Sequence, residues 1–226
     1  GGSLHLALNG MNPQRREWLS RTGPVLLGGL AVSTLGLTGC DKLGLNPMQP
    51  RALTFNAVDI TGADYAKALH LSDPTGRKRS LEEFKGKVVV VFFGFTQCPD
   101  ICPTTMAEVA ELRRRLGADG AKVQGIFVTI DPERDTPEVL AEYVQNLDPG
   151  FVALRGSVEE VTQAAKEFKV FFQKVPTQDG KGYTMDHTAG AFVFDPQGRV
   201  RLFARYGLGL DLLLADVKLL LSDPQG

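Results

Sequence analysis

The stretch "KVVVVFFGFTQCPDICPTT" (residues 87–105) joins a long apolar run to the start of a helix. Its first nine residues are mostly β-branched or aromatic, which predicts a central strand buried on both faces. From Pro103 to Gly117 apolar residues recur at helical spacing, and the closing glycine is typical of a helix C-terminus. Two cysteines, Cys98 and Cys102, therefore lie between a strand and a helix, where functional groups of open α/β sheets collect.

Strand and helix patterns alternate on both sides of this stretch. In chain order they are a hairpin with its turn at 73–76, a strand at 122–130, a helix from Thr136-Pro137 to about 147, a helix opened by a Ser157/Glu160 capping box, a strand at 168–175, a hairpin with its turn at 195–198, and a terminal helix at 210–221. We expect an α/β fold with a central mixed sheet flanked by helices, an order that resembles a thioredoxin-like fold.

The charge balance argues against nucleic-acid binding. The 226 residues include 25 Lys and Arg against 26 Asp and Glu, without the basic excess that nucleic-acid binders usually show. The densest basic run, "LRRRLG" (112–117), is expected to end a solvated helix, where cations suit the helix dipole.

The N-terminal segment has the pattern of an export signal. Residues 11–39 combine arginines with a short uncharged apolar run at 25–37, which spans only about 20 Å as a helix, against about 30 Å of membrane hydrocarbon. This predicts a lipoprotein-type signal peptide; an uncleaved short membrane anchor is the alternative. The "LTGC" ending at Cys40 resembles a bacterial lipobox, in which Cys40 carries a lipid, and "RREWLS" (15–20) resembles a twin-arginine signal more weakly.

These segments set the expected domain boundaries. Residues 1–10 precede the first Met and are interpreted as a cloning remnant or a misassigned start. Residues 40–52 hold glycine and prolines and are interpreted as a tether, and residues 53–226 as the folded domain. The predicted location is the bacterial periplasm, on the membrane surface.

With Cys40 carrying a lipid, Cys98 and Cys102 are the remaining cysteine pair. If 98–102 forms one helical turn, their Cβ atoms lie about 5–6 Å apart, which permits either a shared metal ion or a disulfide. The helix N-terminus is expected to favour thiolate, which is both a metal ligand and a nucleophile. The pair can therefore serve as a metal site, a redox couple or a structural disulfide.

His187 is the candidate third partner. His5 lies outside the domain and His70 in a strand pattern, whereas His187 is expected in a loop directly before a strand. Thioredoxin-like oxidoreductases usually have a cis-proline there, but this chain has Thr188-Ala189-Gly190. Two thiolates and one imidazole form a soft three-ligand set suited to copper, whereas structural zinc usually requires a fourth ligand.

Three motifs resemble the Sco/SenC family of copper proteins: "FFGFTQCPDICPTTMAEV" (92–109), "FVTIDPERDTPEVL" (127–140) and "YTMDHTAGAFVFDPQG" (183–198). The resemblance spans about residues 71–203. It implies a thioredoxin-like domain with an added hairpin, tethered to the membrane, with Cys98, Cys102 and His187 as ligands of Cu(I) or Cu(II). It also implies a role in assembling the Cu(A) centre of cytochrome c oxidase, with oxidase subunit II and other periplasmic copper carriers as partners.

The acidic residues near these motifs allow several roles. By the resemblance, Asp186 could orient His187 as a neighbouring carboxylate, although strand alternation could equally point it to solvent. Asp100 is expected to stay exposed. Asp131, Glu133 and Asp135 are expected to form a turn and start a helix, and "TQDGKGY" (177–183) to form a mobile loop beside His187.

Two other functions remain open. A thiol–disulfide oxidoreductase would use Cys98 and Cys102 to reduce the cysteines of oxidase subunit II, forming a Cys98–Cys102 disulfide. A peroxidase would need a basic neighbour near one reactive cysteine, and no Arg or His lies close to the pair in the sequence.

Overall fold

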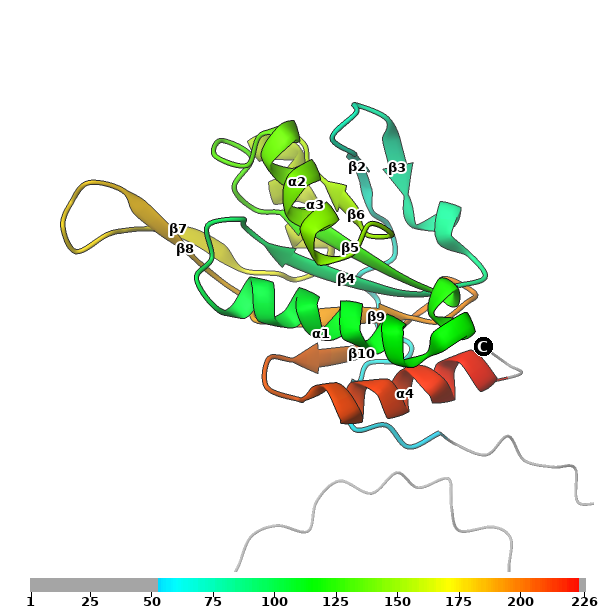
Figure 1. The fold of residues 1–226 in the computed structure, drawn as a ribbon. Coiled ribbons are helices and arrows are strands. Elements are labelled where there is room, and N and C mark those ends of the chain that lie inside the picture. The colour runs from blue at the N-terminus through cyan, green and yellow to red at the C-terminus, as the bar shows by residue number, and fades with distance from the viewer. Residues whose placement is uncertain (1–52, 224–226) are drawn as a thin grey trace, which may run out of the picture. The chain divides into compact units, whose positions relative to one another are not determined.

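The computed structural model describes residues 53–223 (Figure 1). The predicted signal peptide, the Cys40 lipidation site and the tether at 40–52 lie outside the described residues. Within 53–223 no helix is both long and apolar enough to cross a membrane.

A six-stranded mixed sheet forms the centre of the domain, as predicted. Its strands follow the order β1 (Val58–Asp59), β10 (Val200–Arg205), β9 (Gly190–Phe194), β4 (Val88–Gly94), β5 (Val123–Thr129) and β6 (Val152–Leu154). β4, β5 and β6 run parallel, whereas β9 pairs antiparallel with β4. Every residue of β4 is buried, which confirms that the valine-rich run forms a central strand.

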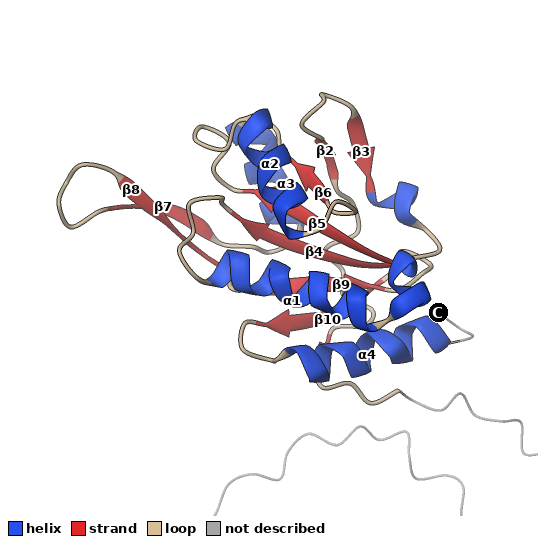
Figure 2. Ribbon diagram, in the orientation of Figure 1, coloured by secondary structure: helices blue, strands red, loops and turns tan. Residues whose placement is uncertain are grey.

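Helices cover both faces of the sheet. They are α1 (Ile101–Arg115), α2 (Pro137–Leu147), α3 (Val158–Glu167) and α4 (Leu210–Ser222), with short 3₁₀ turns at Leu81–Phe84 and Gly117–Lys122. On one face Phe127 of β5 packs against Phe92 and against Tyr143 of α2. On the other face Phe93 packs against Phe168, which follows α3. Figure 2 shows α1 and α4 running beside each other.

The helix starts follow the predicted caps. The Thr136 hydroxyl accepts a hydrogen bond from the Val139 backbone N–H, with Pro137 in the first turn of α2. Ser157 and Glu160 form the reciprocal capping box of α3. The basic residues Arg113–Arg115 occupy the last turn of α1, as expected for a solvated helix end.

Three hairpins complete the domain. β2 (His70–Ser72) with β3 (Lys78–Ser80), and β9 with β10, turn at the predicted places. The third, β7 (Phe172–Pro176) with β8 (Tyr183–His187), projects from the body of the domain (Figure 1). The prediction that His187 lies in a loop was therefore wrong, because 183–187 forms a strand that pairs with β7. The loop before β9 is limited to 188–189, and 177–182 is the turn of the hairpin.

Candidate metal centre

Three side chains from separate elements meet at the carboxyl end of β4. Cys98 follows β4, Cys102 lies in the first turn of α1, and His187 is the last residue of β8. Their ligand atoms all lie within 4.8 Å of one another, and Cys102 Sγ is 3.6 Å from His187 Nε2. Both cysteines are free; Cys98 is half-buried and Cys102 is buried. The fold thus brings together the three residues singled out in the sequence.

The two cysteines do not share one helical turn. α1 begins at Ile101 with Asp100 as its N-cap, so Cys98 lies in the turn that precedes the helix. The Cys98 N–H donates to the Phe95 carbonyl, and the Cys98 sulfur accepts the Cys102 N–H at 3.3 Å. The condition that 98–102 forms one helical turn is therefore not met, but the turn still brings both sulfurs into the same cluster.

The position of the His187 ring is set by two phenylalanines and one carbonyl. Phe92 and Phe95 contact the imidazole edge-on, with ring centroids 5.9 Å and 6.0 Å away. Nδ1 lies 3.0 Å from the Thr188 carbonyl oxygen. Because a carbonyl oxygen only accepts, Nδ1 carries the proton, and Nε2 presents its lone pair to the Cys102 sulfur.

Burial keeps this pair uncharged. Desolvation, with a hydrogen bond to the Cys98 sulfur as a smaller cause, raises the pKa of Cys102 well above its usual range. Desolvation lowers the pKa of His187 below 6.5, partly opposed by the Thr188 carbonyl and the Asp186 charge. The expected preference for thiolate is therefore wrong for Cys102, whose burial outweighs the helix N-terminus. At neutral pH its S–H can donate to His187 Nε2.

A glycine leaves room for the buried sulfur. A Cβ at Gly94 would lie 2.9 Å from Cys102 Sγ and 2.8 Å from the Phe92 ring, both closer than van der Waals contact allows. Only a residue without a side chain therefore fits here, at the end of β4.

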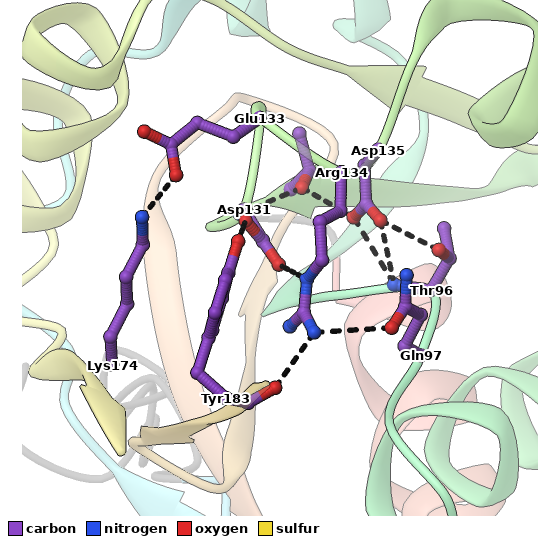
Figure 3. Close-up of polar contacts among 9 residues, drawn as sticks. Thr96, Gln97, Asp131, Glu133, Arg134, Asp135, Lys174 and Tyr183 are labelled. Atoms are coloured by element: carbon purple, nitrogen blue, oxygen red, sulfur yellow. Dashed lines mark hydrogen bonds and ion pairs between the residues drawn. The ribbon is translucent and has the colours of Figure 1, made fainter. Parts of the chain in front are cut away.

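The loop after β5 holds the turn that carries Cys98 (Figure 3). The fully buried Asp135 carboxylate accepts hydrogen bonds from the Thr96 hydroxyl at 2.6 Å, the Thr96 N–H at 3.1 Å and the Thr129 hydroxyl at 2.6 Å. Burial raises the pKa of Asp135, and these hydrogen bonds oppose the rise. The loop was expected only to turn and start a helix. It also joins the turn that carries Cys98 to the end of β5, through Thr96 and Asp135, which are 39 positions apart in the sequence.

The remaining candidate residues lie outside the ligand cluster. Asp186 is exposed, and its place at Nδ1 of His187 is taken by the Thr188 carbonyl. Asp100 is exposed, as expected, and its carboxylate accepts a hydrogen bond from the Tyr206 hydroxyl at 3.3 Å. His70 is an exposed residue of β2. Asp131 and Glu133 pair with Arg134 and Lys174 rather than converging on a second cluster.

The donor set fits a soft metal ion. Two sulfurs and one imidazole nitrogen converge from three directions, and a metal ion among them would take the place of the Cys102 proton. Such sulfur-rich sets favour Cu(I), and thiolate–imidazole sets also hold Cu(II). Asp100 and Asp186, the acids next to the three residues in the sequence, are exposed. Within residues 53–223 the cluster therefore offers three protein donors and not the four of a closed zinc site.

Comparison with known proteins gives consistent matches. The model of the SCO1/SenC protein family matches residues 58–222. The human mitochondrial protein SCO2 homolog is 32% identical over 229 residues, covering 91% of this chain and 80% of the relative.

Solved structures with the same fold include proteins with copper bound. Copper-bound ScoI from Bradyrhizobium japonicum is 38% identical, with a TM-score of 0.60 over 67% of this chain and 96% of that one. Apo Sco1 from Thermus thermophilus is also 38% identical, with a TM-score of 0.66 over 75% and 99%. BsSco, described as having a disulfide switch and as one of the Sco family of cytochrome c oxidase assembly proteins, is 26% identical, with a TM-score of 0.55 over 73% and 98%.

Proposed function

The chain belongs to the SCO1/SenC family, and from this membership and the ligand cluster we propose that it binds copper through Cys98, Cys102 and His187 and delivers it during assembly of cytochrome c oxidase. The recipient we propose is the Cu(A) centre of oxidase subunit II. Copper is here the cargo of the protein.

The convergence of the three donors carries this proposal. Cys102 and His187 approach to 3.6 Å although they belong to different layers of the fold, and Phe92 and Phe95 hold the imidazole with Nε2 toward the sulfur. The copper-bound ScoI relative, 38% identical, supports the same cargo for this chain.

The burial of the three side chains indicates how copper would enter the site. Cys98 is half-buried and Cys102 is fully buried, so an incoming ion meets Cys98 first. Cys102 must lose its proton to become a ligand, which makes binding weaker in acid. His187 is already neutral at physiological pH and needs no such step.

Copper titration of the reduced protein tests this proposal. We expect one copper ion per chain, a sulfur-to-Cu(II) charge-transfer band in the visible spectrum, and transfer of the metal to the apo form of oxidase subunit II. Affinity should fall in His187→Ala and be nearly abolished in Cys98→Ser and Cys102→Ser. Undiminished binding by His187→Ala would contradict the three-ligand site, and a colourless Cu(II) complex would contradict sulfur ligation.

A thiol–disulfide reductase is the second candidate, favoured by the contact between the Cys98 sulfur and the Cys102 N–H. In this reaction Cys98 and Cys102 would lose two electrons and two protons and form a disulfide, while a disulfide of oxidase subunit II would gain them. The disulfide switch described for BsSco supports this alternative. Metal-free reduction of the subunit by His187→Ala at the wild-type rate would favour it over copper transfer.

We also propose that the domain is exported to the bacterial periplasm and held at the membrane by lipid on Cys40. The lipobox-like "LTGC" motif supports this location. In a bacterial host, Cys40→Ser should move the protein from the membrane to the soluble periplasmic fraction. Membrane retention of that variant would instead indicate an uncleaved anchor.

A further inference from the structure

Arg134 lies between the two segments that carry the proposed copper ligands (Figure 3). Its Nη1 donates to the Gln97 side-chain oxygen at 3.1 Å and to the Tyr183 carbonyl at 2.7 Å. Gln97 directly precedes Cys98, and Tyr183 begins β8, the strand that ends at His187. One nitrogen therefore bonds both to the cysteine turn and to the histidine hairpin.

The flat face of the guanidinium makes a second set of contacts. Its central carbon lies 3.8 Å from the centroid of the Tyr183 ring and 5.8 Å from that of Phe95. Phe95 in turn contacts the His187 imidazole edge-on. The planar guanidinium thus packs beside Phe95, one of the rings that contact His187. A lysine ammonium is not planar and cannot pack in the same way.

The loop that carries Arg134 is itself anchored. Asp131 is 1% exposed, and its carboxylate pairs with the Arg134 guanidinium. The same carboxylate accepts a hydrogen bond from the Tyr183 hydroxyl at 2.9 Å. The backbone N–H of Asp131 donates to the Thr129 hydroxyl at 3.0 Å. The backbone N–H of Asp135 donates to the Asp131 carbonyl at 2.9 Å. Thr129 is the last residue of β5, so its hydrogen bond to Asp131, the partner of Arg134, fixes the position of Arg134 relative to the central sheet.

A second ion pair joins the same loop to the same hairpin. The Lys174 ammonium on β7 pairs with Glu133, and it also lies 4.7 Å from the centroid of the Tyr183 ring. Both residues of this pair are about half exposed, so the pair adds little energy by itself. Arg134, with its partly buried guanidinium and bonds to both segments, is the stronger connection.

We propose that Arg134 is a positioning residue for the copper site, setting the distance between the Cys98 turn and the His187 imidazole without contacting the metal itself. This inference rests on the proposed copper function. Loss of the guanidinium fork leaves the two sulfurs together, because Asp135 still holds Thr96. It weakens the attachment of the β7–β8 hairpin, which keeps the Tyr183–Asp131 hydrogen bond and the exposed Lys174–Glu133 pair, and so lets His187 move away. The nitrogen ligand is therefore lost before the sulfur ligands.

Arg134→Lys keeps the charge and removes the fork, and Arg113→Lys is the matched control. Arg113 likewise pairs with an aspartate, Asp148 at 2.6 Å, stacks on an aromatic ring, Phe151, and bonds to a carbonyl, that of Gly120. Its side chain is 17% exposed against 22% for Arg134, and it lies about 16 Å along α1 from Cys102. If Arg134→Lys and Arg113→Lys lose similar stability but only Arg134→Lys changes the copper site, the effect is due to positioning and not to a weakened fold. Gln97→Ala, at an exposed residue, removes one bond of Arg134 with little risk to the fold.

Three measurements on the full-length protein decide the proposal. In Arg134→Lys we expect weaker nitrogen hyperfine coupling in the Cu(II) electron paramagnetic resonance spectrum and about 10-fold faster release of copper to a chelator. Gln97→Ala should shift both in the same direction by less, and Arg113→Lys should match the wild type. In the metal-free protein, the nuclear Overhauser contacts between the His187 and Phe95 rings should weaken in Arg134→Lys, weaken less in Gln97→Ala, and match the wild type in Arg113→Lys.

The outcomes are distinguishable. Unchanged hyperfine coupling, release rate and ring contacts in Arg134→Lys would overturn the positioning role, as would equal changes in Arg113→Lys. A wild-type protein that binds no copper would overturn the proposed function, while the metal-free ring contacts would still decide whether Arg134 positions His187. If Arg134→Lys fails to fold, Gln97→Ala gives the answer, and wild-type behaviour of that variant would contradict the proposal.

Discussion

The Sγ atom of Cys102 lies 3.6 Å from Nε2 of His187, across 85 positions of the chain. This contact joins the first turn of α1 to the end of the β7–β8 hairpin. Because burial favours the neutral thiol and the neutral imidazole, the two groups share a hydrogen bond rather than an ion pair in the metal-free protein.

The two cysteines should differ in reactivity. Cys98 is half-buried, whereas Cys102 is fully buried with a raised pKa, so iodoacetamide at pH 8 should modify Cys98 at least about 10-fold faster in the reduced, metal-free protein. Mass spectrometry of the digested protein over time measures both rates. Comparable rates would show that the folded protein exposes Cys102.

The stability of the metal-free protein should depend on His187 near neutral pH. Its folded pKa lies below 6.5, so the unfolded chain binds the proton more tightly, and stability is lost as pH falls from above 6.5 toward the folded pKa. The free energy of unfolding in urea should therefore fall more steeply between pH 7.5 and 5 in the wild type than in His187→Gln. The difference cannot exceed about 1.4 kcal/mol per pH unit for one proton. Identical slopes would mean that His187 is not desolvated.

Gly94→Ala should disturb the buried sulfur. The new Cβ would lie 2.9 Å from Cys102 Sγ, so we expect a loss of about 1–3 kcal/mol in unfolding free energy and a shifted sulfur-to-Cu(II) band. Gly182→Ala is the control, because its nearest neighbour, the Thr177 hydroxyl oxygen, is 3.9 Å away. Urea unfolding and visible spectra of both variants test this; a stable Gly94→Ala with a normal spectrum would contradict the close packing.

Asp135→Ala should destabilise both the fold and the site. It leaves the Thr96 N–H and the Thr96 and Thr129 hydroxyls without their acceptor, at a cost of about 1–3 kcal/mol in unfolding free energy. Asp216→Ala is the matched control: that buried carboxylate accepts the Asn56 N–H and the Ala57 N–H in the same way. Both variants should lose similar stability, measured by urea unfolding.

Of the two variants, only Asp135→Ala should release copper faster, because Asp135, unlike Asp216, holds the turn before Cys98. Release to a chelator, followed at a temperature where both variants are fully folded, separates the two effects. Equal release rates would assign Asp135 a purely structural role.

Local sequence patterns were sufficient to predict most of the fold. The run 87–95 is apolar throughout because β4 is buried on both faces, and the caps at Thr136 and Ser157 act within three residues of themselves. β8 was missed because "YTMDH" is short and directly follows two glycines; its side chains do alternate between exposed and buried, but its strand structure depends on pairing with β7.

The convergence of Cys98, Cys102 and His187 could be predicted, whereas the residues that hold these three in place could not. Cysteine and histidine carry chemistry that marks them in any sequence. Arg134, by contrast, acts through Gln97 and Tyr183, which are 37 and 49 positions away, and such contacts leave no local periodic signal. For the same reason, Asp135 was interpreted as part of a turn and not as the anchor of Thr96.

The projecting β7–β8 hairpin has a consequence for how the protein matures. Since it carries His187, the third residue of the proposed copper site, in the last quarter of the domain, a chain emerging from its N-terminus presents the two sulfurs well before the imidazole. Closing the intervening 85-residue loop is slow compared with forming α1, because non-local contacts form late in folding. The three side chains therefore come together only once the domain has folded. Copper that met the chain during synthesis would find the cysteine pair without His187.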